Sequence, residues 1–253
     1  MSDDWRHFMC TMGENLASIR VDVGISQKIK GVPRDVAILS LTYKHPDDRG
    51  LPTDREFDAV IAVERQIQNF VAFGRDAYVG RITKEGERIF FIYTVREESR
   101  WQILVERLIA ESGYRIELQM EHDPEHHNYW KYLYPTPDDW QVIRDMAVIE
   151  GLKKSGDDQD ADHTIDHWSY FPDEVSAKRF IAWAVSDRFT HDPARSGPGQ
   201  NGKYCVYLSH VGVTRQRPLS HYTCALRRKA EEHGGEYDGW GTTSVRREDS
   251  GVS

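Results

Sequence analysis

The spacing of hydrophobic positions predicts a chain that alternates between strands and helices. Alternating or mostly apolar runs are typical of strands, whereas apolar residues three and four apart are typical of helices. Helical spacing from Phe57 to Val71 and from Trp101 to Leu108 predicts two helices in the first half. Strands are predicted around them at residues 6–11, 16–23, 36–43, 78–83, 88–95 and 114–120. From residue 36 onward, the predicted order is therefore β-α-β-β-α-β.

The second half repeats this order. Pro172 and the acids after it open one helix, and residues 219–233 form another that Gly234 ends. A further helix at about 137–152 connects the two halves. The two halves share an order of elements but no residue-level similarity. Strands are predicted at residues 163–170, 189–193, 203–211 and 237–245.

These patterns predict an α+β fold of two tandem ferredoxin-like (βαββαβ) units with antiparallel sheets, the first preceded by an N-terminal β-hairpin. Helices would cover one face of each sheet and leave the other face to a partner domain, a partner protein or water. The expected domains are residues 1–136 and 160–253, joined by a connecting helix and linker at 137–159. Residues 151–160 are polar with two glycines, as linkers are, and the polar end at 246–253 is expected to be disordered.

Two polar residues stand out in the first predicted helix. Thr53 precedes this helix and Glu56 follows three residues later, which predicts a capping box at its start. Glu64 is the one residue of the predicted apolar stripe that is not apolar.

The composition indicates a soluble globular protein. Of its 253 residues, 39% are hydrophobic and 29% are charged. No apolar run approaches the ~20 residues of a membrane-spanning helix, and the first residues lack the features of a secretory signal. The scattered cysteines Cys10, Cys205 and Cys224 fit a reducing compartment in which they serve as small buried residues. A cytoplasmic location without membrane contact is expected.

The net charge of −8 argues against a direct nucleic-acid binder, because neutralising phosphates requires clustered Lys and Arg. The acidity is uneven along the chain. Residues 1–159 carry 21 basic and 28 acidic residues, a net charge of −7, and residues 160–253 carry 12 and 13, a net charge of −1.

No catalytic motif occurs in the sequence: we find no phosphate-binding loop, nucleophile elbow or paired Cys-x-x-Cys. Residues 122–127 contain three histidines, but Pro124 disfavours the helix that would bring two of them to one metal. His163 and His167 share one face of a predicted strand. We predict no catalytic residue, no metal and no cofactor, and we expect the protein not to be an enzyme.

Aromatic residues gather at 128–135, 167–171 and 237–241. In so polar a chain, most large aromatic side chains are expected to fill the core or an interface.

The segment Gly-Gly-Glu-Tyr-Asp-Gly-Trp-Gly-Thr at 234–242 resembles the end of the family of regulator of ribonuclease activity B. Its context at 160–245 is similar too, with His-Trp-Ser-Tyr-Phe at 167–171 followed by a helix, a strand and a helix. Members of that family are bacterial protein inhibitors of the endoribonuclease ribonuclease E. The resemblance implies a non-enzymatic regulator that binds a protein, and an acidic regulator would complement the arginine-rich scaffold region of ribonuclease E.

Residues 5–135 resemble a bacterial family of unknown function, of the DUF695 type, which brings no biochemical role. The matching positions are Trp5, residues 49–52, Glu56, residues 78–80, Thr83, residues 90–93, Asp123, Trp130 and residues 132–135.

The favoured function is a cytoplasmic regulator that acts by protein–protein binding on a ribonuclease. The predicted partner-binding residues are Tyr237, Asp238, Trp240, Trp168 and Tyr170. For Trp240, closing the core and contacting a partner are alternative roles.

Two other functions stay open at this point. One is a small-ligand-binding protein or enzyme with a site between the two units, where residues 122–127 and the aromatic residues 129–134 would meet His163 or His167. The other is a structural tandem module that assembles into oligomers. The sequence does not specify the oligomeric state.

Overall fold

The computed structural model describes residues 2, 4–72, 74–199 and 202–246. Within these residues the protein has a mixed α+β fold with eleven strands and seven helices. Every strand pairing is antiparallel, as predicted. The chain divides into unit 1, Met1–Asp139, and unit 2, Trp140–Ser253. None of the described helices is long and apolar enough to cross a membrane.

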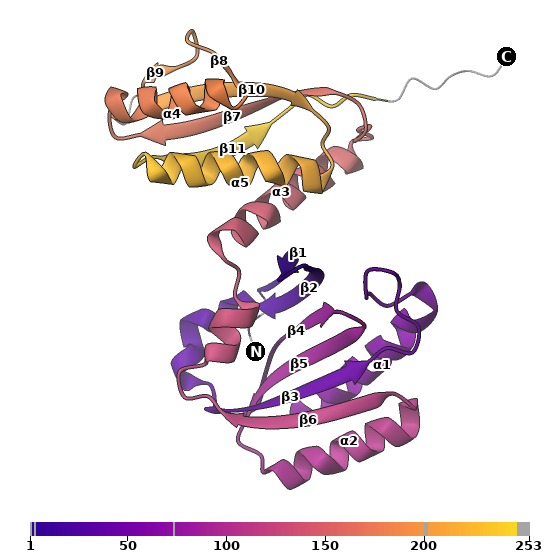
Figure 1. Ribbon diagram of the computed structural model, residues 1–253. Coiled ribbons are helices and arrows are strands. Elements are labelled where there is room, and N and C mark those ends of the chain that lie inside the picture. The colour runs from indigo at the N-terminus through magenta and orange to yellow at the C-terminus, as the bar shows by residue number, and fades with distance from the viewer. Residues whose placement is uncertain (1, 3, 73, 200–201, 247–253) are drawn as a thin grey trace, which may run out of the picture. The chain divides into compact units, whose positions relative to one another are not determined.

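Unit 1 is built on a six-stranded sheet with the order β1-β2-β4-β5-β3-β6 (Figure 1). The hairpin β1–β2 adds two strands beyond β4, and the remaining strands follow the predicted β-α-β-β-α-β sequence. The strands are β1 (Trp5–Met12), β2 (Asn15–Asp22), β3 (Asp35–Thr42), β4 (Ala77–Lys84), β5 (Glu87–Thr94) and β6 (Arg115–His122).

Helices α1 (Asp54–Val71) and α2 (Glu98–Ser112) pack on one face of this sheet. Their apolar stripes are the ones that helical spacing predicts, with Val60 and Ile67 from α1 and Trp101 and Leu108 from α2 fully buried. These side chains meet apolar residues of the sheet such as Phe90 in one core. The helices of unit 1 are therefore held by amphipathic packing.

The second face of the sheet is covered by irregular segments. These are the 3₁₀ helix η1 (Val23–Gly31) and the π-helix η2 (Asn128–Leu133). The Tyr129 hydroxyl donates to the Asp22 carbonyl oxygen at 2.9 Å, and Leu133 packs over Gly80, where a Cβ would lie 2.6 Å from the Arg20 carbonyl oxygen. Of the four aromatic side chains at 128–135, Tyr129 is buried in this core and Tyr134 is half-buried, whereas Trp130 and Tyr132 are exposed.

The predicted capping box at Thr53 and Glu56 is wrong. The Thr53 side chain caps no backbone N–H of α1 and instead donates to the His45 carbonyl oxygen. The buried Glu56 carboxylate accepts the backbone N–H groups of Lys44 and His45 at 2.6 and 3.0 Å. These N–H groups lie just beyond the end of β3, so Glu56 joins that strand end to α1.

Unit 2 has a smaller sheet with the order β11-β7-β10-β8, and β9 also pairs with β10. Helices α4 (Glu174–Ser186) and α5 (Gln216–Glu232) bury Phe180 and Leu226 against it. Helix α3 (Pro137–Lys154) contributes Ile149 to a second cluster that includes Trp240. The strands are β7 (His163–Phe171), β8 (Thr190–His191), β9 (Gly197–Pro198), β10 (Tyr204–Gly212) and β11 (Glu236–Gly241).

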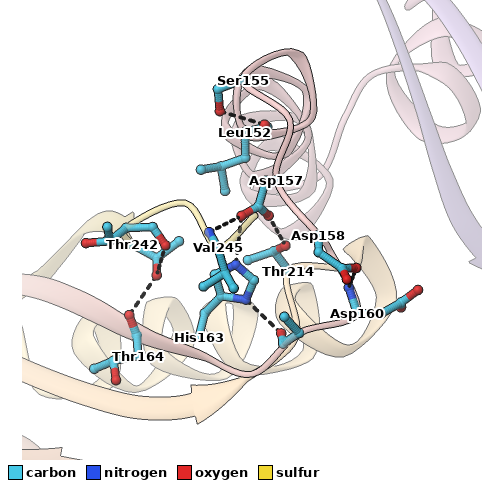
Figure 2. A network of polar contacts seen from close by, with 12 residues as sticks. Leu152, Ser155, Asp157, Asp158, Asp160, His163, Thr164, Thr214, Thr242 and Val245 are labelled. Atoms are coloured by element: carbon cyan, nitrogen blue, oxygen red, sulfur yellow. Dashed lines mark hydrogen bonds and ion pairs between the residues drawn. The ribbon is translucent and has the colours of Figure 1, made fainter. Parts of the chain in front are cut away.

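The segment predicted as a linker is fixed within unit 2 by the carboxylate of Asp157 (Figure 2). This carboxylate lies 2.9 Å from Nε2 of His163 and accepts the Val245 backbone N–H at 2.8 Å and the Thr214 hydroxyl at 3.0 Å. Burial would raise the pKa of Asp157, but the hydrogen bonds from His163, Val245 and Thr214 together lower it. One side chain thus joins the end of α3 to β7, to the start of α5 and to the C-terminal segment.

The same contacts explain why the strand predicted at 237–245 ends at Gly241. Beyond that residue the chain turns to other partners: the Thr242 hydroxyl donates to the Thr164 carbonyl oxygen at 2.8 Å, and Val245 is bonded to Asp157. Arg246, which we predicted to be disordered, forms an isolated bridge with Asp157. Residues 247–253 of that prediction lie outside the described residues.

Candidate protein-binding face

The surface of interest is the face of the unit 2 sheet that points away from α4 and α5, here called the open face. Alternation along β7 sends His167, Ser169 and Phe171 into the core and Trp168 and Tyr170 to the open face. The strand register then places Tyr207 opposite Trp168 and Cys205 opposite Tyr170. On the other side of β7, Glu236 of β11 lies opposite Tyr170.

Gly241 of the 234–242 motif makes room for Trp168. Gly239 lies opposite Trp168, in a β-bulge between Tyr237 and Gly239, with a φ of 144° that side chains rarely adopt. A Cβ on Gly241 would come within 3.0 Å of Cη2 of the Trp168 indole. The motif therefore positions an aromatic ring of the neighbouring strand on the open face.

Arg195 shows how this face holds a guanidinium. Its Nη1 lies 3.0 Å from the Asp166 carboxylate, and its guanidinium carbon lies 4.5 Å from the ring centre of Tyr207. The Tyr207 ring centre is in turn 6.1 Å from that of Trp168. Residues 195–199 border a shallow groove of about 600 Å³ whose floor includes Tyr170, Cys205 and Tyr207.

The five predicted partner-binding residues divide between the two faces of the sheet. Trp168 and Tyr170 are half-buried, and Asp238 is exposed within the bulge of β11, next to β7. Tyr237 and Trp240 are buried on the core side, at 5% and 8% exposure.

A buried carboxylate anchors Trp240. Its indole N–H donates to Oδ1 of Asp145 on α3 at 3.0 Å. Asp145 is fully buried and also accepts from Gln141, Ser220 and Thr223 at 2.6–2.8 Å. Burial raises the pKa of Asp145, although these four donors favour the charged form. The motif thus ties β11 to α3, and the cluster ties α3 to α5.

Tyr237 ends a chain of buried hydrogen bonds. Its hydroxyl lies 2.8 Å from Nδ1 of His167, and Nε2 of His167 lies 2.8 Å from Nδ1 of His210 on β10. The two imidazole rings are nearly parallel, and Phe189 and Tyr222 flank His210. A neutral pair satisfies the His167–His210 contact with one shared proton, whereas protonation of both rings would place two N–H groups against each other.

This pair makes unit 2 sensitive to acid. Burial lowers the pKa of His210 to about 4, and burial together with His210 lowers that of His167 well below its ordinary value. Because the unfolded histidines take up protons near pH 6.5, the pair's contribution is complete above that pH and is lost as the pH falls towards 4. The shift of His210 alone should lower the free energy of unfolding of unit 2 by about 3 kcal/mol over this range, and the shift of His167 adds to this fall.

Urea unfolding of the full chain at several pH values measures this fall. His210→Asn keeps a donor near the position of Nδ1 but does not titrate, so its curve should be flatter than that of the wild type. Equal slopes in the two proteins would contradict the assignment.

The other histidines that the sequence singled out are bonded within their own units. In unit 1, His122 pairs with Asp35 at 2.6 Å and His126 lies 3.0 Å from the Pro33 carbonyl oxygen. In unit 2, His163 is bonded to Asp157. Among the residues that the structure describes, no three His, Cys, Asp or Glu side chains converge as a metal site would require.

Sequence reasoning missed Tyr207 and Arg195. Alternation along residues 203–211 sets Tyr207 on the side opposite to Val206 and Leu208, but a single sequence gives no register that would place it beside Trp168. Arg195 lies next to a glycine-rich loop and carries no periodic signal.

The structure thus defines a two-unit α+β protein with antiparallel sheets, whose second unit presents an aromatic and charged sheet face of the kind that protein interfaces use. Residues 3–134 match the family described as a family of unknown function (DUF695), and the chain belongs to that family. Residues 143–242 match the family described as regulator of ribonuclease activity B, whose members are non-catalytic. Both resemblances stated from the sequence are confirmed. The second match begins within α3, consistent with the Asp145–Trp240 bond.

A comparison with curated proteins finds no match. Among solved structures, the chain aligns with a putative glycine cleavage system transcriptional repressor at 8% identity and a TM-score of 0.24, over 84% of this chain and 98% of that one. It also aligns with an unknown protein from Galdieria sulphuraria at 11% identity and a TM-score of 0.22, over the same shares of the two chains. At these TM-scores, neither alignment informs the fold or the function.

Proposed function

We propose that the protein is a non-enzymatic regulator that inhibits an endoribonuclease of the ribonuclease E type by binding it through the open face of unit 2. The match of residues 143–242 to a family of ribonuclease regulators carries this proposal. A cytoplasmic, bacterial setting and a ferredoxin-like classification of both units belong to the same proposal. The classification is supported by the strand orders β6-β3-β5-β4 and β11-β7-β10-β8.

The chemistry of the open face favours an arginine-bearing segment of the ribonuclease as the occupant. Glu236 and Asp238 are exposed beside Tyr170 and Trp168, which combines carboxylates with aromatic faces. A guanidinium pairs with carboxylates and stacks on aromatic rings, as Arg195 does between Asp166 and Tyr207. Trp168, Tyr170 and Asp238 are therefore the predicted contact residues that can reach a partner, while Tyr237 and Trp240 support the face from beneath.

Replacing Tyr207, which lies on the open face beside Trp168, tests whether this face binds the ribonuclease. We expect Tyr207→Ser to weaken binding to the ribonuclease by about 10- to 100-fold, because interface aromatic anchors contribute 2 kcal/mol or more. The measurement is calorimetric titration of the full chain with a ribonuclease of this type, alongside an RNA cleavage assay.

Tyr132→Ser is the matched control, since Tyr132 is an exposed tyrosine of unit 1. It should bind and inhibit as the wild type does. Affinity that also falls steeply with salt would support the arginine contact. If the wild-type chain neither binds nor inhibits the ribonuclease, the proposed function fails; if Tyr207→Ser binds normally, the open face is not the docking surface.

A further inference from the structure

A row of basic side chains crosses three neighbouring strands of unit 1, on the face that α1 and α2 cover elsewhere in the sheet. His7 of β1 lies directly opposite Arg20 of β2, and Arg20 lies directly opposite Arg81 of β4. Residues directly opposite each other in an antiparallel pair share a face, so His7, Arg20 and Arg81 form one row of basic side chains, in which the two arginines carry the positive charge. Arg88 of β5 stands on the same face, opposite Thr83.

Among the described residues, one carboxylate forms ion pairs with the arginines of this face. Glu64 of α1 pairs with Arg81 and lies 3.3 Å from Arg88, whose side chain is only 3% exposed. The Arg20 guanidinium lies 5.1 Å above the Trp5 ring. Asp22, the other acid on this face of the hairpin, is buried and accepts the backbone N–H of Ser2 at 3.0 Å. Three guanidiniums against the carboxylates of Glu64 and Asp22 leave an excess of one positive charge, and none of the ion pairs among the described residues includes Arg20.

The placement of Arg20 directly opposite Arg81 lowers the stability of the fold. Like charges directly opposite each other on neighbouring strands destabilise a sheet, and such local conflicts in a folded chain are expected at functional sites. At His7, desolvation by the surrounding chain and then the charges of Arg81 and Arg20 lower the pKa. An anion bound across the row would remove the conflict.

The row is also reachable. The His7 side chain is exposed, and Arg20 and Ser18 are half-buried, because the hairpin extends the sheet beyond β4 and contributes only Trp5 to the core under α1 and α2. The His7 Nε2 and the Ser18 hydroxyl lie 2.8 Å apart and add hydrogen-bonding groups beside the guanidiniums.

We propose that this row is a binding site for the phosphate group of a small ligand. A phosphate monoester is anionic at neutral pH, which complements the excess of positive charge, and its oxygens suit the forked donors of arginine. A long nucleic acid is disfavoured, because residues 1–159 carry a net charge of −7 and would repel the flanking phosphates. The site is independent of the regulatory surface proposed for unit 2.

Calorimetric titration of the full chain with AMP, inorganic phosphate, adenosine and a short single-stranded RNA tests the proposal. We expect saturable binding of AMP and phosphate and none of adenosine. Arg20→Gln should weaken AMP binding at least tenfold, because it removes a charge-assisted hydrogen bond. Arg20→Lys keeps the charge and the contact with Trp5 but loses the fork, so its affinity should fall between those of the wild type and Arg20→Gln.

Arg6→Gln is the matched control. Arg6 belongs to the same hairpin but lies opposite Val21, on the other face, and pairs with Asp4. Its affinity for AMP should stay within twofold of the wild type. Failure of the wild type to bind AMP or phosphate at millimolar concentration would overturn the proposal, as would equal losses in Arg6→Gln and Arg20→Gln. RNA that binds more tightly than AMP and shows the same Arg20 dependence would overturn the assignment to a small ligand.

Discussion

Trp240→Ala is expected to unfold unit 2, or to lower its free energy of unfolding by about 3–5 kcal/mol. The indole is 8% exposed and packs with Ile149, Ile165 and Leu219. Alanine would leave a cavity at the place where α3, α5 and β11 meet. It would also remove one of the four donors that hold the buried Asp145 carboxylate.

Trp240→Phe separates the two contributions. Phenylalanine keeps most of the packing and loses only the N–H bond to Asp145, so we expect a loss of about 1.5–3 kcal/mol, the range for hydrogen bonds to charged groups. Urea unfolding of the full chain, followed by circular dichroism, measures both variants. Trp130→Ala is the control, because Trp130 is 42% exposed in unit 1. Normal stability in Trp240→Ala combined with lost ribonuclease binding would make Trp240 a contact residue.

The hydrophobic pattern predicted most of the elements because their stability comes from periodic burial. The apolar stripes of α1 and α2 face the core of unit 1, as predicted. In unit 2, every second side chain of β7 is buried, and the buried side chains of β10 include Val206 and Leu208 in the core. The pattern also placed His163 and His167 on one face of β7, and both are buried there.

The errors lie where a carboxylate replaces apolar packing. Glu56 binds backbone N–H groups twelve and eleven residues away in sequence, so a local capping pattern gave the wrong partner. Asp157 bonds Val245, 88 residues along the chain, and this contact converts an apparently flexible linker into a fixed loop. Composition cannot reveal such contacts, because the residues that make them are also common in solvated loops.

The open face was only partly predictable for a related reason. Sequence resemblance selected the 234–242 segment as a whole, but alternation assigns its residues to opposite sides of β11. Tyr237 and Trp240 support the core, and Gly241 after them accommodates Trp168. A resemblance therefore identified the correct region, while the pairing of β11 with β7 decided which side chains can meet a partner.

Glu64→Leu is expected to lower the free energy of unfolding of unit 1 by about 3–5 kcal/mol. The Glu64 side chain is 3% exposed and is the carboxylate partner of Arg81 and Arg88, and it accepts the Tyr78 hydroxyl at 3.0 Å. Arg88 also donates from Nε to the Tyr43 hydroxyl at 3.1 Å, so it cannot swing out to water without breaking a second buried contact. Leucine fills the space but leaves the Arg88 charge buried without its counter-charge.

The double variant Glu64→Leu/Arg88→Met distinguishes charge from packing. Removing both charges takes away the buried, unpaired guanidinium, and we expect the double variant to recover more than half of the loss. Glu117→Ala is the surface control, because the Arg115–Glu117 pair is 75% and 61% exposed and should contribute less than about 1 kcal/mol. Urea unfolding of the wild type, Glu64→Leu, Arg88→Met and the double variant gives the coupling energy between the two side chains. A double variant as unstable as the sum of its single variants would show that Glu64 acts through packing, and the sole off-pattern residue of α1 would then have no electrostatic role.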